Sequence, residues 1–289
     1  MTSENNNPVP GKRRSSLVDH ARHDPATALA SLFRPISKGR RPGGIEVNSE
    51  FDGLELKFMV WRALDTRDQS LLLAIIGLAG ISRERLDPQN AGERGQQLWL
   101  DLDPQEQAKF DRATIITTSR YNLLKAANMP DTGRYYGMLE ESLNRLSMVG
   151  CRAKKDSYQW SMQMLSYAEA PDGQINIALN SRFATALGGQ FVWVSLDERH
   201  QLNGDIAQVT HGWLSAWLKQ GRTQSIGADK LVNKVWGTDA SPSTARKRRQ
   251  RLMQALDEIS ALPGWRVRRK GIGAKLIIQI TRPKILEKI

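Results

Sequence analysis

The sequence holds a single cysteine, Cys151, so its 289 residues cannot form an internal disulfide. Proteins without disulfides are typical of reducing compartments, and we expect a cytoplasmic protein. Long apolar runs are also missing, because the longest one covers only residues 71–80 and a bilayer span needs about 20 residues. The N-terminus has no apolar core of the signal-peptide kind. The sequence therefore predicts no membrane partner and no export.

Residue patterns typical of catalytic sites are missing as well. The chain has no Gly-x4-Gly-Lys-Ser/Thr loop, which argues against a P-loop ATPase. His20 and His23 lie beside two aspartates, but no cysteine or second histidine pair follows at zinc spacing. We interpret this segment as an arm that packs or contacts phosphate. The prediction is a protein that is not an enzyme, with no metal and no cofactor.

Negative charge is scarce at both ends of the chain. The formal net charge is +12, and the sequence pI is about 10.0. Residues 240–289 hold 13 Lys or Arg and 3 Asp or Glu, and residues 1–44 hold 8 and 3. A strongly basic balance favours a polyanionic partner. The concentration of charge near the C-terminus indicates a dedicated binding surface.

Two series of expected elements follow the same order along the chain. The first series contains helices near residues 66–78, 118–127 and 133–149, a short strand at 97–102, and a hairpin over 158–179. The second contains helices near 205–218, 228–236 and 242–262, a short segment at 225–226, and a hairpin over 265–281. Helix, helix, turn, helix and β-hairpin is the plan of a winged-helix domain.

We therefore predict an α+β, mainly helical fold with tandem winged-helix domains. Residues 1–44 would form a flexible basic N-terminal arm, and residues 45–180 the first winged-helix domain. Residues 181–289 would form the second domain. Its main DNA-recognition helix would be 242–262 and its wing 265–281.

The start of the 242–262 helix carries five cations within six positions, 246–251. Its predicted core side is formed by Ala245, Leu252, Leu256 and Ile259. At about 100° per residue, the opposite side holds Ser243, Lys247, Gln250 and Gln254, flanked by Arg246 and Arg251. Lysine and glutamine there can bond base edges in a major groove. Arg248 and Arg249, nearer the core edge, suit phosphate contacts. A solvated charged helix and a nuclear-type basic signal are the alternatives.

The predicted DNA contacts of the second domain are Ser243, Thr244, Arg246, Lys247, Arg248, Arg249, Gln250 and Arg251 in the helix, and Arg266, Arg268, Arg269, Lys270 and Lys275 in the hairpin. Charge on the hairpin also protects an edge strand, and both interpretations hold together. The first domain offers a weaker set, namely Arg134, Asn144, Arg145, Lys154 and Lys155. Because Glu140 and Glu141 lie among them, a dimerisation or partner surface is left open there.

Several segments together resemble the RepC-type replication initiators of IncQ plasmids. They are Arg22-His23-Asp24-Pro25-Ala26, Leu32-Phe33-Arg34, Leu179-Asn180, Gly188-Gly189-Gln190, Ser195-Leu196-Asp197-Glu198, Val235-Trp236, the run from Ser243 to Arg251, Gly264-Trp265 and Thr281-Arg282-Pro283-Lys284. The ordered set is specific, and it spans most of the chain.

The resemblance implies a non-enzymatic initiator. Such proteins bind repeated sites (iterons) at a plasmid origin as double-stranded DNA and help to open a neighbouring AT-rich segment. A plasmid-encoded helicase and primase are then recruited. Tandem winged helices, and a homodimer that could control copy number, are further implications of the resemblance.

Two other hypotheses stay open at this point. A winged-helix transcriptional repressor would use the same recognition helix without a role in origin melting. A metal-dependent nickase would belong to another class altogether, and it would need a close histidine pair beside a strand, which the sequence lacks.

Overall fold

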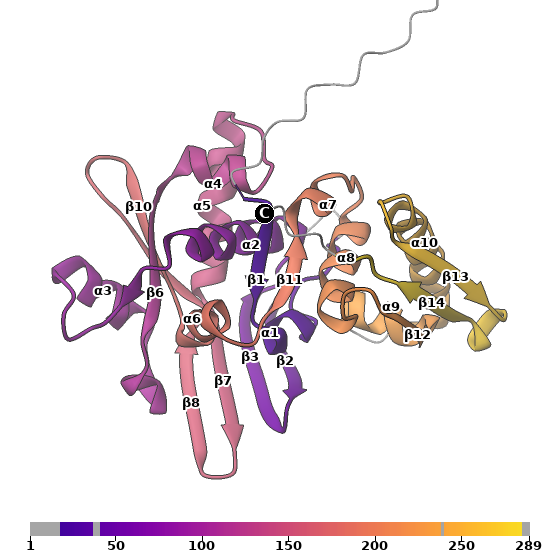
Figure 1. The fold of residues 1–289 in the computed structure, drawn as a ribbon, viewed down its shortest axis with the longest axis horizontal. Helices are drawn as coiled ribbons and strands as arrows, with labels where there is room; N and C mark the ends of the chain where they lie inside the picture. Colours follow the sequence, from indigo (N-terminus) through magenta and orange to yellow (C-terminus); the bar gives the residue numbers. More distant parts are fainter. Residues whose placement is uncertain (1–17, 37–40, 238–239, 285–289) are drawn as a thin grey trace, which may run out of the picture.

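The expectation of a mainly helical chain built from tandem winged-helix domains is wrong. The computed structural model describes residues 18–36, 41–237 and 240–284. It is 43% helical and 30% strand, and its strands form several sheets (Figure 1). Much of the extra strand lies in β2 (Gly43–Phe51) and β3 (Leu54–Arg62), which form a long hairpin where no element was expected. Its alternating buried residues, Leu56, Phe58 and Val60, are the period-two signal of a half-buried strand.

The N-terminal part of the molecule combines two sheets around one central helix. A five-stranded sheet has the order β2-β3-β7-β8-β5, with β7 (Val149–Lys155), β8 (Tyr158–Gln163) and β5 (Gln105–Glu106). A four-stranded sheet has the order β4-β6-β10-β9, with β4 (Arg85–Leu86), β6 (Ala113–Ser119), β10 (Gln174–Leu179) and β9 (Leu165–Glu169). All the pairings in both sheets are antiparallel.

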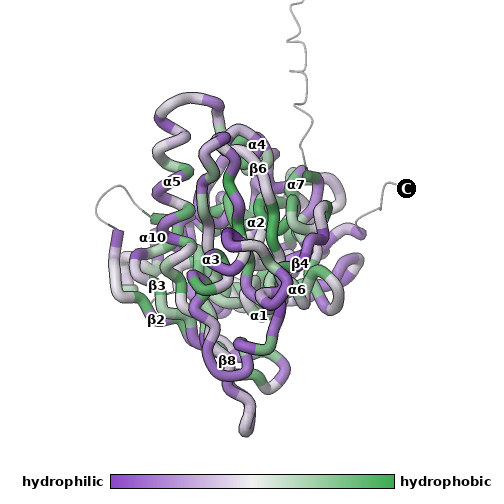
Figure 2. The backbone as a smooth tube through the Cα atoms, turned by 90° about the vertical axis from the view of Figure 1, so that its left-hand side faces the viewer, coloured by the Kyte–Doolittle hydropathy of each residue, from purple (hydrophilic) through white to green (hydrophobic). Residues whose placement is uncertain are grey.

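The helices of this part are α2 (Thr66–Ser82), α3 (Glu93–Asp101), α4 (Arg120–Ala126), α5 (Gly133–Ser147) and α6 (Ser181–Gly188), with the short 3-10 helix η1 (Gln107–Phe110). Helix α2 is apolar on nearly every side and packs against α4, α5 and β6, and its hydrophobic colour is visible in Figure 2. Asp65 starts α2 with a capping box. The strand expected at 97–102 is wrong, because these residues lie in α3 or at its end.

The C-terminal part follows the expected order of elements. It comprises α8 (Asp205–Trp217), β12 (Thr223–Gly227), α9 (Ala228–Trp236), α10 (Pro242–Ser260), β13 (Arg266–Lys270), the 3-10 helix η2 (Gly273–Lys275) and β14 (Ile277–Thr281). The strand order β12-β14-β13 places the hairpin against the strand between α8 and α9. We call residues 205–281 the C-terminal unit (Figure 1).

Each part has its own hydrophobic core. The N-terminal core runs from Val18 to Leu196, and the second core runs from Leu202 to Ile280. Between them lie β11 (Val192–Ser195) and α7 (Leu196–His200). The division of the chain into domains at residues 44 and 180 stays a prediction.

Hydrogen bonds from buried side chains join the two parts. Arg199 is 1% exposed, and its guanidinium donates to the carbonyl oxygen of Thr66 at 3.1 Å and to Ser70 Oγ at 3.1 Å, both in α2. The indole of Trp213 in α8 donates to the carbonyl oxygen of Leu29 at 3.2 Å. Burial strongly lowers the pKa of Arg199, to about 9. Such contacts fix α8 on the N-terminal core.

Part of the expected flexible arm belongs to the fold. His20–His23 form β1, which pairs antiparallel with β11. The short helix expected after Pro25 is confirmed as α1 (Pro25–Leu29). Asp24 caps it by accepting from Thr27 N at 2.8 Å, and it also pairs with Arg182 of α6 at 3.0 Å. Residues 1–17 of the arm lie outside the described residues.

Candidate nucleic-acid interface

Helix α10 has clear start and stop signals. Ser241 is its N-cap, its side chain accepts from Thr244 N at 3.4 Å, and Pro242 occupies the first turn. The helix ends before Pro263 and before Gly264, whose φ is +80°. Its buried residues are Leu252, Ala255, Leu256 and Ile259. Packing of this apolar face on α8 and α9 fixes which side chains of α10 face solvent.

The exposure of α10 follows the predicted helix phase, except that Ala245, expected on the core side, is only half-buried. The residues expected to point away from the core, namely Ser243, Lys247, Gln250 and Gln254, are all exposed. Thr244, Arg246 and Arg251 are exposed as well. The outer face therefore offers a hydroxyl, an ammonium and two amides between flanking guanidiniums. That these groups contact DNA stays a prediction.

Arg248 and Arg249 lie at the edge of the core, as their phase required, and both are half-buried. The guanidinium of Arg248 lies 5.7 Å from the centroid of the Trp236 ring, within cation–π range. Burial lowers its pKa. Arg249 pairs with Asp229 of α9 and donates to it from Nε at 2.9 Å. Arg249 therefore already holds a carboxylate of the neighbouring helix.

The hairpin after α10 separates its cations by face. Alternation along β13 places Arg266, Arg268 and Lys270 on one side, where all three are exposed. Arg269 points to the other side and donates to the carbonyl oxygen of Met253 at 2.9 Å. It also pairs with Asp257 of α10. Lys275, in η2 at the tip, is exposed.

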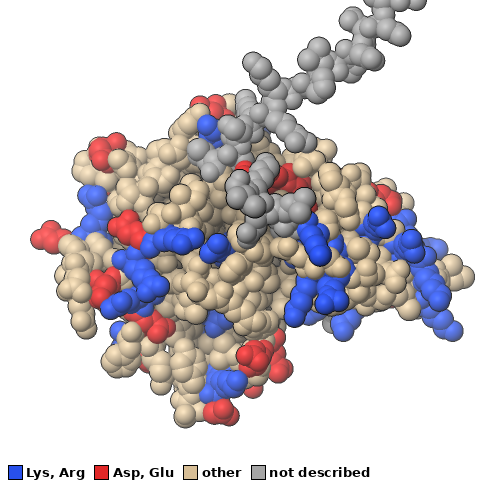
Figure 3. Space-filling view, viewed as in Figure 1, with Lys and Arg blue, Asp and Glu red and all other residues tan. Residues whose placement is uncertain are grey.

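Positive charge gathers over the C-terminal unit on the face drawn in Figure 3, whereas the N-terminal part shows both signs there. This agrees with the uneven charge along the sequence, and it places the cations of α10 and of β13 on one end of the molecule.

The candidates of the N-terminal part are not equivalent to one another. Arg134, at the start of α5, and Asn144 are exposed. Arg145 is not free, because its guanidinium donates to the fully buried Asp68 of α2 at 2.9 Å. Burial alone would lower the pKa of Arg145, but its hydrogen bonds to Asp68 raise it. Arg145 is therefore a packing residue, and we do not place it in the interface.

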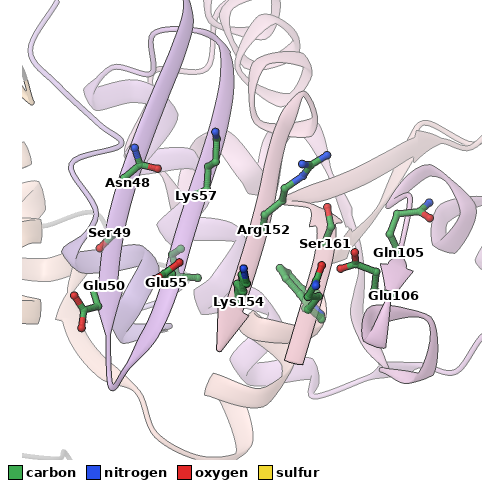
Figure 4. A pocket seen from close by; sticks show the side chains of 14 residues that line it. Asn48, Ser49, Glu50, Glu55, Lys57, Gln105, Glu106, Arg152, Lys154 and Ser161 are labelled. Atoms are coloured by element: carbon green, nitrogen blue, oxygen red, sulfur yellow. The ribbon is translucent and has the colours of Figure 1, made fainter. Parts of the chain in front are cut away.

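Lys154 and Lys155 lie at the end of the β7–β8 hairpin and are exposed. Lys155 donates to the carbonyl oxygen of Asp52 at 3.0 Å, in the turn between β2 and β3. Lys154 borders a trough of about 860 Å³ on the outer face of the five-stranded sheet. Figure 4 shows this trough, whose charged lining residues are Glu50, Glu55, Lys57, Glu106, Arg152 and Lys154. Its mixed charge gives it no preference for a polyanion.

No group of three or more His, Cys, Asp or Glu side chains gathers as a metal site among the residues described. His23 packs its ring against Phe183, and burial lowers its pKa to about 4. None of the described helices is long and apolar enough to span a bilayer.

Arg34 was not among the predicted contacts, and its guanidinium lies beside Gly237 at the end of α9, although about 200 residues separate the two in sequence. In the sequence, Arg34 lies within the predicted flexible basic arm of residues 1–44, and no local pattern indicates its neighbours in the fold. Lys230 and Lys234 of α9 were also missed, and they line a groove of about 970 Å³ against β2.

Comparison with known proteins gives a fold and a family. A search of curated proteins finds no match. A crystal structure of domains 2 and 3 of RctB is 12% identical, with a TM-score of 0.53, covering 86% of this chain and 94% of that one. A second RctB structure of domains 2–3 is 11% identical, with a TM-score of 0.47, covering 88% and 95%. At such identity, the first likeness shows a shared fold only. The sequence profile of Replication protein C (RepC) matches residues 15–284, and this chain therefore belongs to the replication protein C family.

Proposed function

We propose that this replication protein is a plasmid replication initiator that binds iteron repeats of an origin as double-stranded DNA. Helix α10 would enter the major groove, with the β13–β14 hairpin beside it on the phosphate backbone. The observation that carries the proposal is the outer face of α10, where Ser243, Lys247 and Gln250 are exposed opposite a fully apolar buried face.

The exposed face divides into groups with different expected roles. Lys247 and Gln250 would reach base edges, since lysine bonds the acceptors of guanine and glutamine suits adenine. Arg246 and Arg251, on the flanks, would contact phosphates, as would Thr244 at the first turn. On the hairpin, Arg266, Arg268, Lys270 and Lys275 are exposed and would bind the backbone. These contacts would make affinity strongly salt-dependent.

Two predicted contacts receive a different role in this proposal. Arg249 and Arg269 already hold Asp229 and Asp257, respectively. In this proposal, Arg249 holds α9 against α10, and Arg269 holds the hairpin against α10. Both arginines thereby orient the residues that contact DNA. Exposed ion pairs of this kind contribute little to stability, about 0–1 kcal/mol.

Opening of the neighbouring AT-rich DNA and loading of a plasmid helicase and primase complete the proposal. The family assignment supports this part. The protein would act without catalysis, by spending binding free energy on distorting the duplex. A homodimer is compatible with this scheme but not required by the α10 surface.

Footprinting on the origin of the parent plasmid, together with permanganate probing, tests the proposal. We expect regularly spaced protected repeats, and protein-dependent reactive thymines in an adjacent AT-rich segment. Protection without reactive thymines would favour a transcriptional repressor that uses the same surface. Absence of specific protection would refute the proposal, and open circles formed from supercoiled plasmid with a divalent metal would indicate a nickase instead.

A further inference from the structure

The exposed apolar side chains of the C-terminal unit gather at one place. Among the residues described there, the exposed large apolar side chains are Ile272, which is 88% exposed, and Ile277, which is 45% exposed. Both lie at the tip of the β13–β14 hairpin, where water contact with an apolar side chain is unfavourable in the free protein. In Figure 1 this tip is the part of the C-terminal unit that projects farthest from the N-terminal part.

Cations surround the two isoleucines. Lys270 pairs with Ile277 across the hairpin, so their side chains share the outer face of the sheet, which carries the exposed cations of β13. Lys270 and Lys275, on either side of Ile272 in sequence, are exposed as well. An apolar tip between cations suits a partner that combines negative charge with apolar faces. Duplex DNA is such a partner, because its phosphates lie outside a stack of bases.

The turn fixes the backbone from which the side chain of Ile272 projects. Gly271 has φ +86°, and a Cβ there would lie 2.6 Å from the carbonyl oxygen of Lys275, so a larger residue would clash. The backbone N–H of Lys275 donates to the carbonyl oxygen of Ile272 at 3.1 Å. The N–H of Ala228 donates to the carbonyl oxygen of Leu276 at 2.9 Å, which anchors the tip to the start of α9. A tip held in this way loses little conformational entropy on binding.

We propose that the side chain of Ile272 inserts between two stacked base pairs of the duplex that α10 contacts, from the minor groove beside the hairpin. Isoleucine is among the apolar side chains that proteins use to unstack a base step and kink the duplex. The free energy of burying the side chain offsets part of the cost of unstacking. Lys270 and Lys275 bind phosphates on the two sides of the step, whether or not the isoleucine inserts.

The inference rests on the proposed function and deepens it, because it assigns the distortion of the duplex to one residue. The outer face of α10 selects the site by its base contacts, whereas Ile272 offers no hydrogen bond to a base edge. Its preference is therefore for a step that opens easily, and pyrimidine–purine steps such as TA are the most flexible.

The test compares the purified full chain with Ile272→Ala and Ile272→Leu on an origin duplex that the wild type protects. Ile81→Ala is the matched control, because Ile81 is 66% exposed but lies near the end of α2 in the N-terminal part. Energy transfer between the duplex ends measures the bend, and 2-aminopurine placed at successive steps reports unstacking. For the wild type we expect a kink of about 20–90° with one unstacked step.

Ile272→Ala should lose most of the kink and the 2-aminopurine signal, and should bind the duplex about three- to tenfold more weakly. The slope of log K against log salt should stay that of the wild type, because no phosphate contact is removed. Ile272→Leu should keep the kink, since leucine also fills an opened step. All variants should unfold at the wild-type temperature, because the substituted side chains are exposed.

An unbent wild-type complex, or a kink that persists in Ile272→Ala, would overturn the inference. So would an equal loss of the kink in Ile81→Ala. If Lys247→Ala still relaxes sequence preference in those cases, the proposed function stands and only the inference fails. Absence of specific protection on the origin would refute both.

Discussion

Helices α5 and α10 both carry arginines on a helix that follows a shorter one, yet their arginines are used differently. In α10 the guanidiniums of Arg246 and Arg251 are exposed. In α5 the side chain of Arg145 is only 10% exposed, and its guanidinium is bonded to a carboxylate of α2. The number of basic residues in a helix therefore overstates how many of them can bind a ligand. A buried acid elsewhere in the chain can pair with one of them and neutralise its charge.

The largest effect on the free energy of unfolding is expected at Asp68, the buried acid that binds Arg145. Asp68 accepts from Arg145, from Arg41 and from the backbone N–H of Asp65. Asp68→Ala would remove the buried carboxylate that two half-buried guanidiniums share, leaving them only their more exposed partners Asp65 and Glu141. It should lower the free energy of unfolding by about 3–5 kcal/mol. Urea unfolding followed by circular dichroism measures this change.

Glu141→Ala is the matched control, since Glu141 also pairs with Arg145 but its side chain is 73% exposed. Its removal should change the free energy of unfolding by less than about 0.5 kcal/mol. Equal losses of unfolding free energy in both variants would show that the interior does not hold Arg145. The arginine of α5 would then be as available to a ligand as those of α10.

Lys247→Ala tests base reading by α10. A contact to a base edge is worth about 1–3 kcal/mol of discrimination, so we expect the ratio of specific to random DNA affinity to fall by that amount. Competition binding with an origin duplex and a scrambled one measures the ratio. Equal loss on both duplexes would contradict the role that we assign to the outer face of α10.

Arg268→Ala tests the hairpin as a phosphate contact. Binding to all duplexes should weaken similarly, and the slope of log K against log salt should become smaller by about one unit. A salt titration on both duplexes gives the slope. A change in sequence preference with an unchanged slope would instead place Arg268 at a base edge.

The smallest effect is expected for Arg134→Ala at the start of α5. Its side chain is exposed, but α5 also carries Glu140 and Glu141, which make the helix a poor phosphate surface. We expect less than about 0.5 kcal/mol of lost affinity for the origin duplex. A loss as large as that of Lys247→Ala would show that both helices read DNA and would remove the contrast between them.

Local patterns predicted much of the C-terminal unit. Three signals mark α10, and each of them lies within a few neighbouring residues: the cap at Ser241, the apolar spacing from Leu252 to Ile259, and the breaker at Pro263-Gly264. Helix phase then placed Lys247 outside and Arg248 at the core edge, because the period of an α-helix is fixed. The hairpin followed from alternation around Gly271, whose φ is +86°.

The N-terminal part was harder to predict because its sheets depend on distant pairing. β3 pairs with β7 across about 90 residues, and β6 pairs with β10 across about 60. Such strands show only weak alternation locally, and their partners cannot be read from spacing. Leu98 and Trp99 likewise suggested a strand, but packing of α3 against the four-stranded sheet stabilises a helix there.

The sequence by itself determined where charge is dense, where α10 begins and ends, and which of its faces meets solvent. These properties depend on residue type and helical period alone. Only the tertiary structure decided which cations stay available. Asp68 pairs with Arg145, Asp229 with Arg249, and Asp257 with Arg269. The β-bridge of Phe33 with Leu64 lies next to Arg34, whose guanidinium is at the end of α9. Ion pairing and burial act over a few ångströms in space, and chain contacts between distant segments set those distances.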